Sequence, residues 1–302
     1  MTRFGRDFPF LREELTGALF VFVKVSDDEY SVFVLATESE IDEFLDFFGI
    51  SPTETNALLS VDACNPEERE RLEFHKFIEG LTVDFPTSLE ISRAAQRIQG
   101  LVHDHDEYIV SRPDDKLLHW TSVEYMLFRE LEQARYGSLV SKGFPSMDLF
   151  IDTANQVLNR RKSRAGKSLE YHLAALFEGN SLQFGQQVVT EQNKRPDFIF
   201  PSDETYHDSN FPTEKLVMLA AKTTCKNRWR QVINEADRLK GREKFLCTLQ
   251  QGISSAQLDE MRSENITLVV PQPYIKEYPR EKRDSIWTVS SFINHVRELQ
   301  QS

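Results

Sequence analysis

The chain has 302 residues, of which 40% are hydrophobic and 28% charged, enough for one large folded domain or a large domain with a small one. No run of about 18 apolar residues exists, and no apolar segment follows a basic N-terminus, so we expect no membrane-spanning helix, no secretory signal and a cytoplasmic location. Its three cysteines, Cys64, Cys225 and Cys247, have neither the pairing of a disulfide framework nor the spacing of a zinc site.

The net charge of −12 argues at first against a nucleic-acid partner, because binding phosphates requires a basic surface. The distribution of charge is more informative than the sum. Residues 160–168 carry five basic side chains and no acidic one, and residues 222–230 carry four and none. An acidic exterior around a basic cleft is compatible with DNA binding.

The N-terminal part predicts a small α+β segment. Residues 17–25 and 30–36 are rich in β-branched and aromatic side chains and predict a hairpin. Thr37 and Glu40 form a capping-box pattern that opens a helix ending before Gly49, and a second helix is expected from residue 66 to about residue 80. A hairpin and two helices are too little to bury a core alone, so we interpret the segment as an appendage.

After Pro86 the chain changes from helices to an alternation of strands and helices. Apolar residues at helical spacing predict helices over residues 88–103, 114–136, 146–161 and 167–177, the last two separated at Gly166. Strands are then expected over residues 186–190, 197–200, 216–222, 244–249 and 267–270, with helices over 228–240, 254–263 and 287–299. This order predicts an α/β fold with a mixed central sheet flanked by helices.

Acids and lysines from separate segments are expected to converge. Asp197 starts a short apolar strand and Lys222 ends a longer one, so the two can lie side by side. Carboxylates that hold Mg²⁺ beside a lysine are suited to phosphodiester hydrolysis. The second acid that many nucleases carry two positions before the lysine is Ala220 here, but Glu235 on the following predicted helix could replace it. Glu170, in the first turn of a helix from Lys167, would be another member.

Three segments of the sequence resemble segments of a known protein family. Residues 160–170, 194–198 and 221–237 resemble the C-terminal catalytic domain of EcoRII-type restriction endonucleases, in the PD-(D/E)xK nuclease superfamily. The resemblance begins near residue 86 and implies a catalytic domain over 86–302, with residues 1–85 as part of an effector-like N-terminal domain. It implies Mg²⁺-dependent cutting of both strands of double-stranded DNA at a CCWGG-like site. It also implies a homodimer and a cognate DNA cytosine methyltransferase in the same restriction-modification system.

The resemblance also assigns roles to residues. It places metal ligands at Glu170, Asp197 and Glu235, the catalytic lysine at Lys222, a second lysine at Lys226 and an assisting tyrosine at Tyr206. Its base-reading segment falls on residues 162–164, where an arginine can read guanine in the major groove. The expected DNA contacts are Arg160, Lys162, Arg164, Tyr125, Arg228 and Arg230.

Alternatives remain open at this point. A nuclease of the same fold could cut by DNA structure and without a sequence requirement, and a decayed gene could encode a DNA-binding protein that does not cleave. Tyr125 could stack on a flipped base or belong to a buried helix stripe with Phe128. The basic run of residues 160–167 could be an ordinary solvated helix end.

Overall fold

The computed structural model describes residues 12, 15–26, 29–55, 68–103, 107–226 and 228–302. The chain forms two compact units. Residues 1–44 and 185–288 make up the first, here called the sheet unit, and residues 45–184 and 289–302 make up the second, the helical unit.

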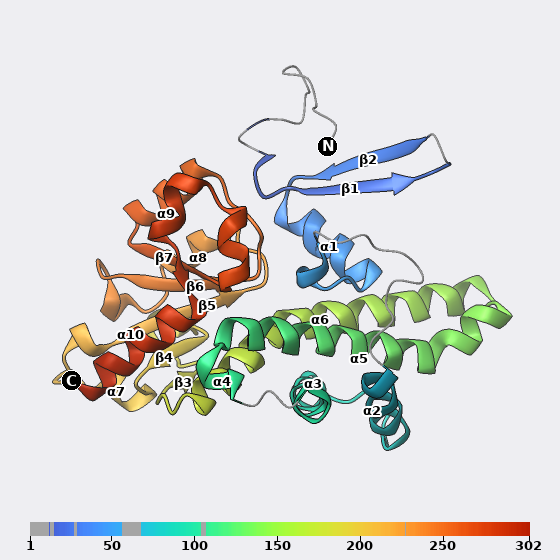
Figure 1. Ribbon diagram of the computed structural model, residues 1–302, viewed down its shortest axis with the longest axis horizontal. Coiled ribbons are helices and arrows are strands. Elements are labelled where there is room, and N and C mark those ends of the chain that lie inside the picture. Colours follow the sequence, from blue (N-terminus) through green and yellow to red (C-terminus); the bar gives the residue numbers. More distant parts are fainter. Residues whose placement is uncertain (1–11, 13–14, 27–28, 56–67, 104–106, 227) are drawn as a thin grey trace. The chain divides into compact units, whose positions relative to one another are not determined.

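The sheet unit is built on a six-stranded mixed sheet (Figure 1). Its strands, in spatial order, are β3 (Gly185–Gln186), β4 (Phe198–Phe200), β5 (Val217–Lys222), β6 (Lys244–Thr248), β7 (Ile266–Val270) and β8 (Trp287–Thr288). Strand β4 pairs antiparallel with both β3 and β5, and the strands from β5 to β8 are parallel to one another. The predicted mixed sheet is confirmed.

Short helices cover this sheet and complete its core. The central strands β5 and β6 are buried on both faces, as their unbroken apolar sequences require. Trp229 and Val232 of α8 and Leu258 and Met261 of α9 join the core of this unit. The helical segments are α7 (Asp203–His207), α8 (Trp229–Ile233), α9 (Ser255–Ser263), η3 (Glu191–Asn193), η4 (Thr213–Lys215), η5 (Asp237–Leu239), η6 (Gln272–Glu277) and η7 (Arg280–Ser285).

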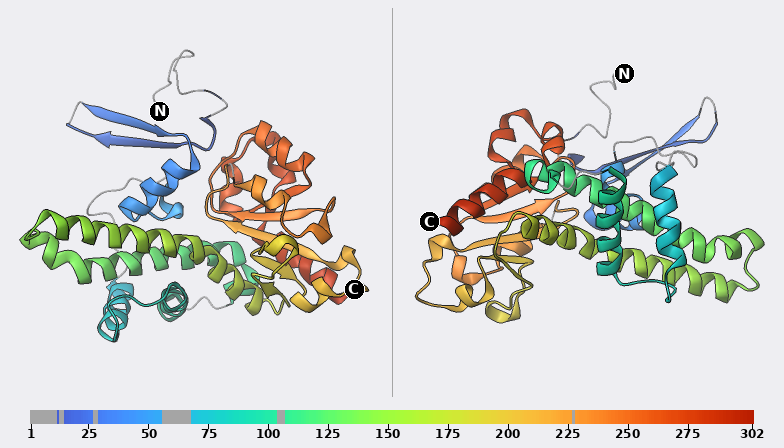
Figure 2. Two further views of the ribbon diagram at one scale, coloured as in Figure 1. Left: turned by 180° about the vertical axis from the view of Figure 1, so that it is seen from behind. Right: turned by 60° about the horizontal axis from the view of Figure 1, so that its bottom comes forward.

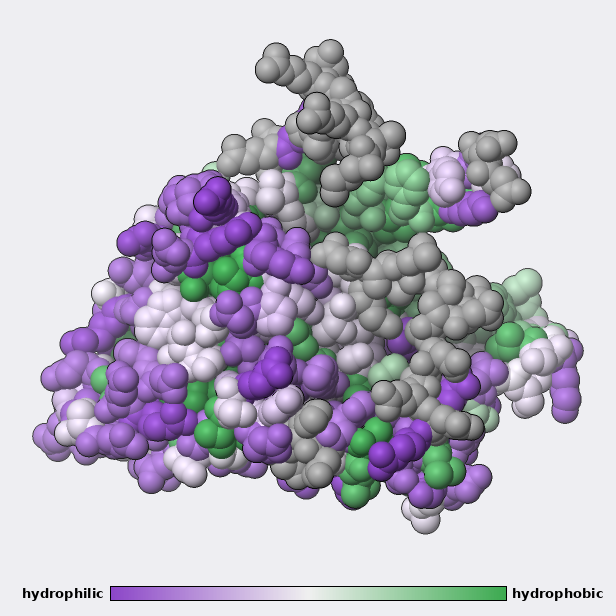
Figure 3. Space-filling model, in the orientation of Figure 1, coloured by the Kyte–Doolittle hydropathy of each residue, from purple (hydrophilic) through white to green (hydrophobic). Residues whose placement is uncertain are grey.

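The N-terminal hairpin also belongs to the sheet unit. Strands β1 (Leu19–Lys24) and β2 (Tyr30–Leu35) pair antiparallel, as predicted. The apolar side chains of the hairpin gather visibly on the surface (Figure 3), and Phe22 and Phe33 are each 55% exposed. Helix α1 (Glu38–Phe48) follows and spans the division between the units.

Helix α1 begins and ends as its sequence predicts. The side chain of Glu40 accepts hydrogen bonds from the backbone and hydroxyl of Thr37, and the Thr37 hydroxyl accepts one from the Glu40 backbone. Gly49 follows the helix with a left-handed φ of +63°. The capping box and the glycine stop are therefore both confirmed.

Two long helices dominate the helical unit. Helices α5 (Pro113–Lys142) and α6 (Met147–Gly179) lie side by side in all three ribbon views (Figures 1 and 2), and α3 (Ser88–His103) packs against both. A core between α2, α3 and α5 includes Phe74, Ile91, Leu127 and Leu131. The other helical segments are α2 (Glu68–Glu79), α4 (Tyr108–Ser111), α10 (Val289–Gln301) and η2 (Pro52–Glu54).

Three predicted helix boundaries are wrong. Helix α6 continues through Gly166, and α5 continues through Gly137, where breaks were expected. A glycine inside a helix costs only about 1 kcal/mol, which the buried residues on either side outweigh. Conversely, α8 ends at Ile233 and not at residue 240, because Ala236 adopts a left-handed φ of +52° that cannot continue a helix. None of the helices in the described part of the chain combines the length and apolarity needed to span a bilayer.

Candidate active site

Asp197 and Lys222 meet at the ends of two adjacent strands. Asp197 immediately precedes β4 and Lys222 is the last residue of β5, and these two strands pair antiparallel. Lys222 Nζ lies 2.9 Å from Asp197 Oδ2 and donates a hydrogen bond to it. The predicted side-by-side placement of this acid and this lysine is what the structure has.

Three donors hold the carboxylate of Asp197, which is only 5% exposed. Oδ2 accepts the backbone N–H of Ala221 at 2.7 Å in addition to Lys222. Oδ1 accepts the side-chain amide of Gln187 at 2.9 Å. The carboxylate is thus a fixed acceptor, with its orientation set from both oxygens.

Glu235 is the second acid near this pair. It follows α8 by two residues, in a bend before the left-handed Ala236, so the prediction that it lies on a helix is corrected. Its Oε2 atom is buried without a hydrogen-bond partner among the described residues. Burial raises the pKa of Glu235 to about 7; Lys222 opposes that rise and Asp197 adds to it. Glu235 therefore shares an electrostatic environment with the Asp197–Lys222 pair.

Two lysines hold the backbone of the Glu235 bend, and the sequence analysis did not select either. Lys244 is 4% exposed, and its Nζ donates to the carbonyl of Ile233 at 2.8 Å and to that of Glu235. Lys194 Nζ donates to the carbonyl of Asn234 at 2.5 Å. The available signal was a lysine at the first position of the apolar strand β6, where a buried charge requires partners.

Tyr206 lies in the core of the sheet unit, not among the site's acids. Its hydroxyl donates to Glu191 Oε2 at 2.7 Å, and the same oxygen accepts the backbone N–H of Asp237 at 3.0 Å. Burial raises the pKa of the Tyr206 phenol further above its already high ordinary value, so the hydroxyl keeps its proton at neutral pH. The contacts connect Tyr206 to the bend that presents Glu235, and its predicted assisting role stays a prediction.

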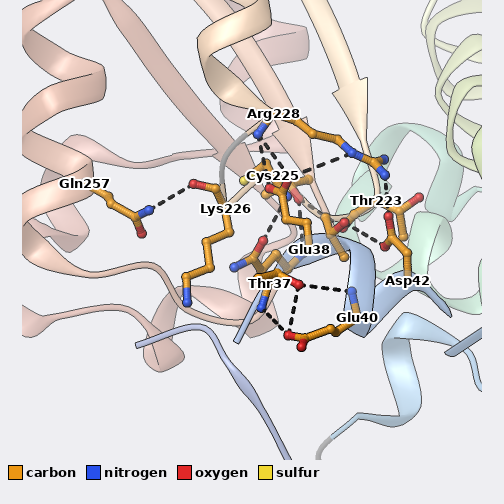
Figure 4. Close-up of polar contacts among 12 residues, drawn as sticks. Thr37, Glu38, Glu40, Asp42, Thr223, Cys225, Lys226, Arg228 and Gln257 are labelled. Atoms are coloured by element: carbon orange, nitrogen blue, oxygen red, sulfur yellow. Dashed lines mark hydrogen bonds and ion pairs between the residues drawn. The ribbon is translucent and has the colours of Figure 1, made fainter. Parts of the chain in front are cut away.

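Arg228 contacts the acidic start of α1 (Figure 4), and Lys226 contacts Ala36, just before that helix. Lys226 Nζ donates to the carbonyl of Ala36 at 2.9 Å, and burial lowers its pKa. Arg228 pairs through its guanidinium with Asp42 and through its backbone N–H with Glu38. The structure thus places Arg228 at the acidic first turns of α1 and Lys226 at Ala36, two positions before the helix. Arg230 is exposed and pairs with Glu260 at 2.7 Å.

The other predicted site residues belong to the helical unit. Glu170 lies in the middle of α6, not in a first helical turn as predicted, and accepts hydrogen bonds from Lys167 Nζ at 2.8 and 3.0 Å. Lys162 is exposed on the same helix. The guanidinium of Arg160 stacks over Phe85, 4.2 Å from the ring centroid.

Arg164 is enclosed in a buried network. It is 3% exposed, its Nη1 lies 3.1 Å from Glu124 Oε1, and its guanidinium is 4.0 Å from the ring centroid of Tyr125. Glu124 also accepts a hydrogen bond from Ser92 at 2.6 Å and lies 2.9 Å from His172 Nε2. In this structure Arg164 and Tyr125 are therefore core residues, and their predicted contacts with DNA stay predictions.

The acids of the sheet unit fit Mg²⁺ better than a metal that needs a full protein cage. In the described part of the chain no group of three or more His, Cys, Asp or Glu side chains is placed to hold a metal. Mg²⁺ is commonly bound by one or two carboxylates together with substrate phosphates. The buried Oε2 of Glu235, which has no hydrogen-bond partner in the described part of the chain, is an oxygen ligand that a divalent cation would satisfy.

Comparisons with known proteins agree on one family. The model of the family described as EcoRII C terminal matches residues 128–293. The type II restriction enzyme EcoRII of Escherichia coli is 46% identical over 230 residues, which cover 74% of this chain and 54% of EcoRII. The type II restriction enzyme SsoII of Shigella sonnei is 26% identical over 156 residues, 49% of this chain and 50% of SsoII. The chain thus spans about half the length of these curated relatives.

Solved structures show the same fold. Metal-depleted Ecl18kI, in complex with uncleaved, modified DNA, gives a TM-score of 0.59 at 20% identity and covers 78% of this chain and 85% of its own. The restriction endonuclease PspGI, in a complex with substrate DNA, gives 0.56 at 16% identity over 72% of this chain and 94% of its own. The mixed sheet flanked by helices is therefore a restriction-endonuclease fold.

Proposed function

The chain belongs to the EcoRII C-terminal family, and from this premise we propose that it is a type II restriction endonuclease. The proposed reaction is hydrolysis of one phosphodiester bond in each strand of double-stranded DNA at a CCWGG-like site. The observation that carries the proposal is the Asp197–Lys222 pair beside Glu235, whose buried Oε2 has no partner among the described residues, at the strand ends of an endonuclease-type sheet.

The residues of the sheet unit divide the work of hydrolysis. Lys222 brings a positive charge to the place where negative charge develops on the phosphate, and it helps to position the attacking water. Asp197 holds Lys222 in place through their 2.9 Å contact. Tyr206 supports the site from the core side, and Lys226 is proposed to reach the DNA phosphates.

Mg²⁺ is the proposed cofactor, and it would be held by Asp197 and Glu235, with Glu170 as the further ligand that the family resemblance assigns. A bound Mg²⁺ would supply charge neutralisation at the phosphate and activation of water. Two carboxylates of the sheet unit share one electrostatic environment, as a divalent cation requires.

The partners follow from the chemistry of a symmetric DNA site. Cutting both strands requires two active sites related by a two-fold axis, so the proposed enzyme is a homodimer. Residues 86–302 would form the nuclease and residues 1–85 a partial effector-like segment, and the family match at 128–293 falls within the former. A cytosine methyltransferase of the same system would protect the cell's DNA, and the enzyme would act in the cytoplasm. The proposed DNA contacts are Arg160, Lys162, Arg164, Tyr125, Arg228 and Arg230.

The test compares cleavage by the wild type and Asp197→Asn on plasmids that carry CCWGG or CCSGG sites, with and without Mg²⁺. Asp203→Asn is the matched control, because Asp203 is an exposed aspartate on α7 of the same unit. We expect discrete Mg²⁺-dependent ends at one motif for the wild type and Asp203→Asn, and none for Asp197→Asn, at a temperature where the unfolding curves show all three proteins to be folded.

Other outcomes would replace the proposal with a specific rival. Ends that follow junctions or flaps, with no sequence in common, would indicate a structure-selective nuclease. Specific DNA binding by a wild-type protein that produces no cleavage with Mg²⁺ would indicate a binding protein.

A further inference from the structure

We infer that Gln187 is a positioning residue of the active site, which sets the orientation in which Asp197 presents its free oxygen lone pair to a cation. The inference deepens the proposed function and rests on it. Gln187 follows the edge strand β3, beside Asp197 of the neighbouring strand. No sequence motif marks it.

Gln187 donates two hydrogen bonds to Asp197. Its backbone N–H donates to the backbone carbonyl of Asp197 at 3.1 Å, and its side-chain Nε2 donates to Oδ1 of the Asp197 carboxylate at 2.9 Å. The first contact extends the antiparallel pairing of β3 and β4 by one residue. The second crosses from the strand edge into the site, so the strand pairing itself aims the amide at the carboxylate.

The hydrogen bonds to the Asp197 carboxylate determine which of its lone pairs remains open to a cation. Each oxygen of an ionised carboxylate has two acceptor positions. In the described structure Oδ2 uses both, for the Ala221 N–H at 2.7 Å and for Lys222 at 2.9 Å. Oδ1 uses one, for Gln187, and so one position on Oδ1 is left for a cation. Without the amide, only the two donors on Oδ2 would hold the carboxylate, and Oδ1 would lose the hydrogen bond that fixes the direction of its open position.

The backbone at Gln187 is held in a conformation that glutamine rarely adopts. Its φ is +51°, in the left-handed region that costs an L-residue roughly 1–2 kcal/mol. Strained backbone of this kind tends to be found where surrounding contacts enforce it, often at functional sites. The left-handed backbone of Gln187 is thus a second feature of the residue, observed separately from its side-chain contact with Asp197.

Gln187→Asn separates the amide contact from the backbone strain. Asparagine tolerates left-handed backbone at least as well as glutamine, but its side chain is one methylene shorter and cannot reach Oδ1. Gln192→Asn is the matched control, because Gln192 is exposed and has a similar φ of +59°. Both variants make the same chemical change in the same backbone conformation.

The experiment measures Mn²⁺ binding to the full chain by the electron paramagnetic resonance signal of the free ion, with thermal unfolding recorded in parallel. Mn²⁺ is the probe because carboxylate sites for Mg²⁺ accept it. We expect Gln187→Asn to weaken Mn²⁺ binding about 10-fold or more, the usual effect of removing a partner of a metal ligand. Its unfolding midpoint should stay near those of the wild type and of Gln192→Asn.

The possible results are distinguishable. Equal Mn²⁺ affinity in the wild type and Gln187→Asn would overturn the role of Gln187 and leave the proposed function standing. A loss that Gln192→Asn reproduces, or one that follows a fall in the unfolding midpoint, would also overturn it. If Asp197→Asn binds Mn²⁺ as tightly as the wild type does, the proposed metal site is refuted, and the inference about Gln187 with it.

Discussion

Replacing Glu124 by glutamine tests whether Arg164 is a structural residue. The carboxylate of Glu124 is fully buried and contacts Arg164, which is 3% exposed, as well as Ser92 and His172. Burial alone would raise the pKa of Glu124, but His172, Arg164 and Ser92 together hold it at about 2, so the group is charged at neutral pH. Glu124→Gln keeps the shape of the side chain and leaves the guanidinium without a countercharge.

The expected loss is large because water cannot replace the missing charge. Breaking a buried ion pair by removing one partner costs about 3–5 kcal/mol. Urea-induced unfolding at neutral pH would measure the free energy of unfolding of Glu124→Gln and of a control, Glu130→Gln. Glu130 lies on the same helix in a partly exposed pair with Arg71, 4.0 Å apart, and its substitution should cost under about 1 kcal/mol.

A double-mutant cycle makes the reasoning refutable. Adding Arg164→Met to Glu124→Gln removes the unpaired charge and should recover a substantial part of the lost stability, because neighbouring residues in one network are not additive. A loss under about 1 kcal/mol for Glu124→Gln alone would show that Arg164 is not buried in solution as it is here. That result would favour the prediction, made from the family resemblance, that Arg164 contacts DNA.

Three further substitutions test the backbone contacts near Glu235 and the ends of two helices. Lys244→Met should lower the free energy of unfolding by about 2–3 kcal/mol, because the carbonyls of Ile233 and Glu235 lose a charged donor. Lys240 is exposed, so Lys240→Met should change the free energy of unfolding little in the same urea titration. Equal effects of the two substitutions would argue against a role of Lys244 in holding the backbone near Glu235. Ser181→Gly should raise the thermal unfolding midpoint, because Ser181 follows α6 with a φ of +58°, whereas Gly49→Ala after α1 should lower it, and the opposite signs would contradict the backbone assignment.

The sequence was sufficient where local patterns and burial agree. Continuous apolar runs predicted strands β5 and β6, and the capping box predicted the start of α1, because each pattern has one strongly preferred structure. The Asp197–Lys222 pair was predictable for a similar reason, since each residue stands at the end of an apolar strand and adjacent antiparallel strands bring such ends together.

The sequence was insufficient where packing overrides local preference. Gly166 and Gly137 continue helices because tertiary contacts outweigh a small propensity cost. The left-handed backbone at Gln187 and Ala236 has no local signal, since neither residue type favours it, and both residues shape the site. The sequence predicts Arg164 to contact DNA. Only the packing of α5, α6 and α3 shows that Arg164 pairs with Glu124 in the core.

We expect the ionised carboxylate of Glu235 to lower the stability of the protein when no divalent cation is bound. Its Oε2 is buried without a partner among the described residues, and burial raises its folded-state pKa to about 7, above the value of about 4.5 expected for an unfolded chain. A carboxyl group with a raised pKa binds its proton more tightly in the folded state, so its cost is absent below about pH 4.5 and develops as the pH rises to about 7. Glu235→Gln does not titrate, and above pH 7 without divalent cations it should be more stable than the wild type, by up to about 3 kcal/mol. Urea unfolding at pH 5 and pH 8 measures the difference, which should grow with pH and shrink when Mg²⁺ is added, because only the wild type gains a countercharge. A variant that is less stable than the wild type at pH 8 would show that the carboxylate is already paired, and so not available for a cation.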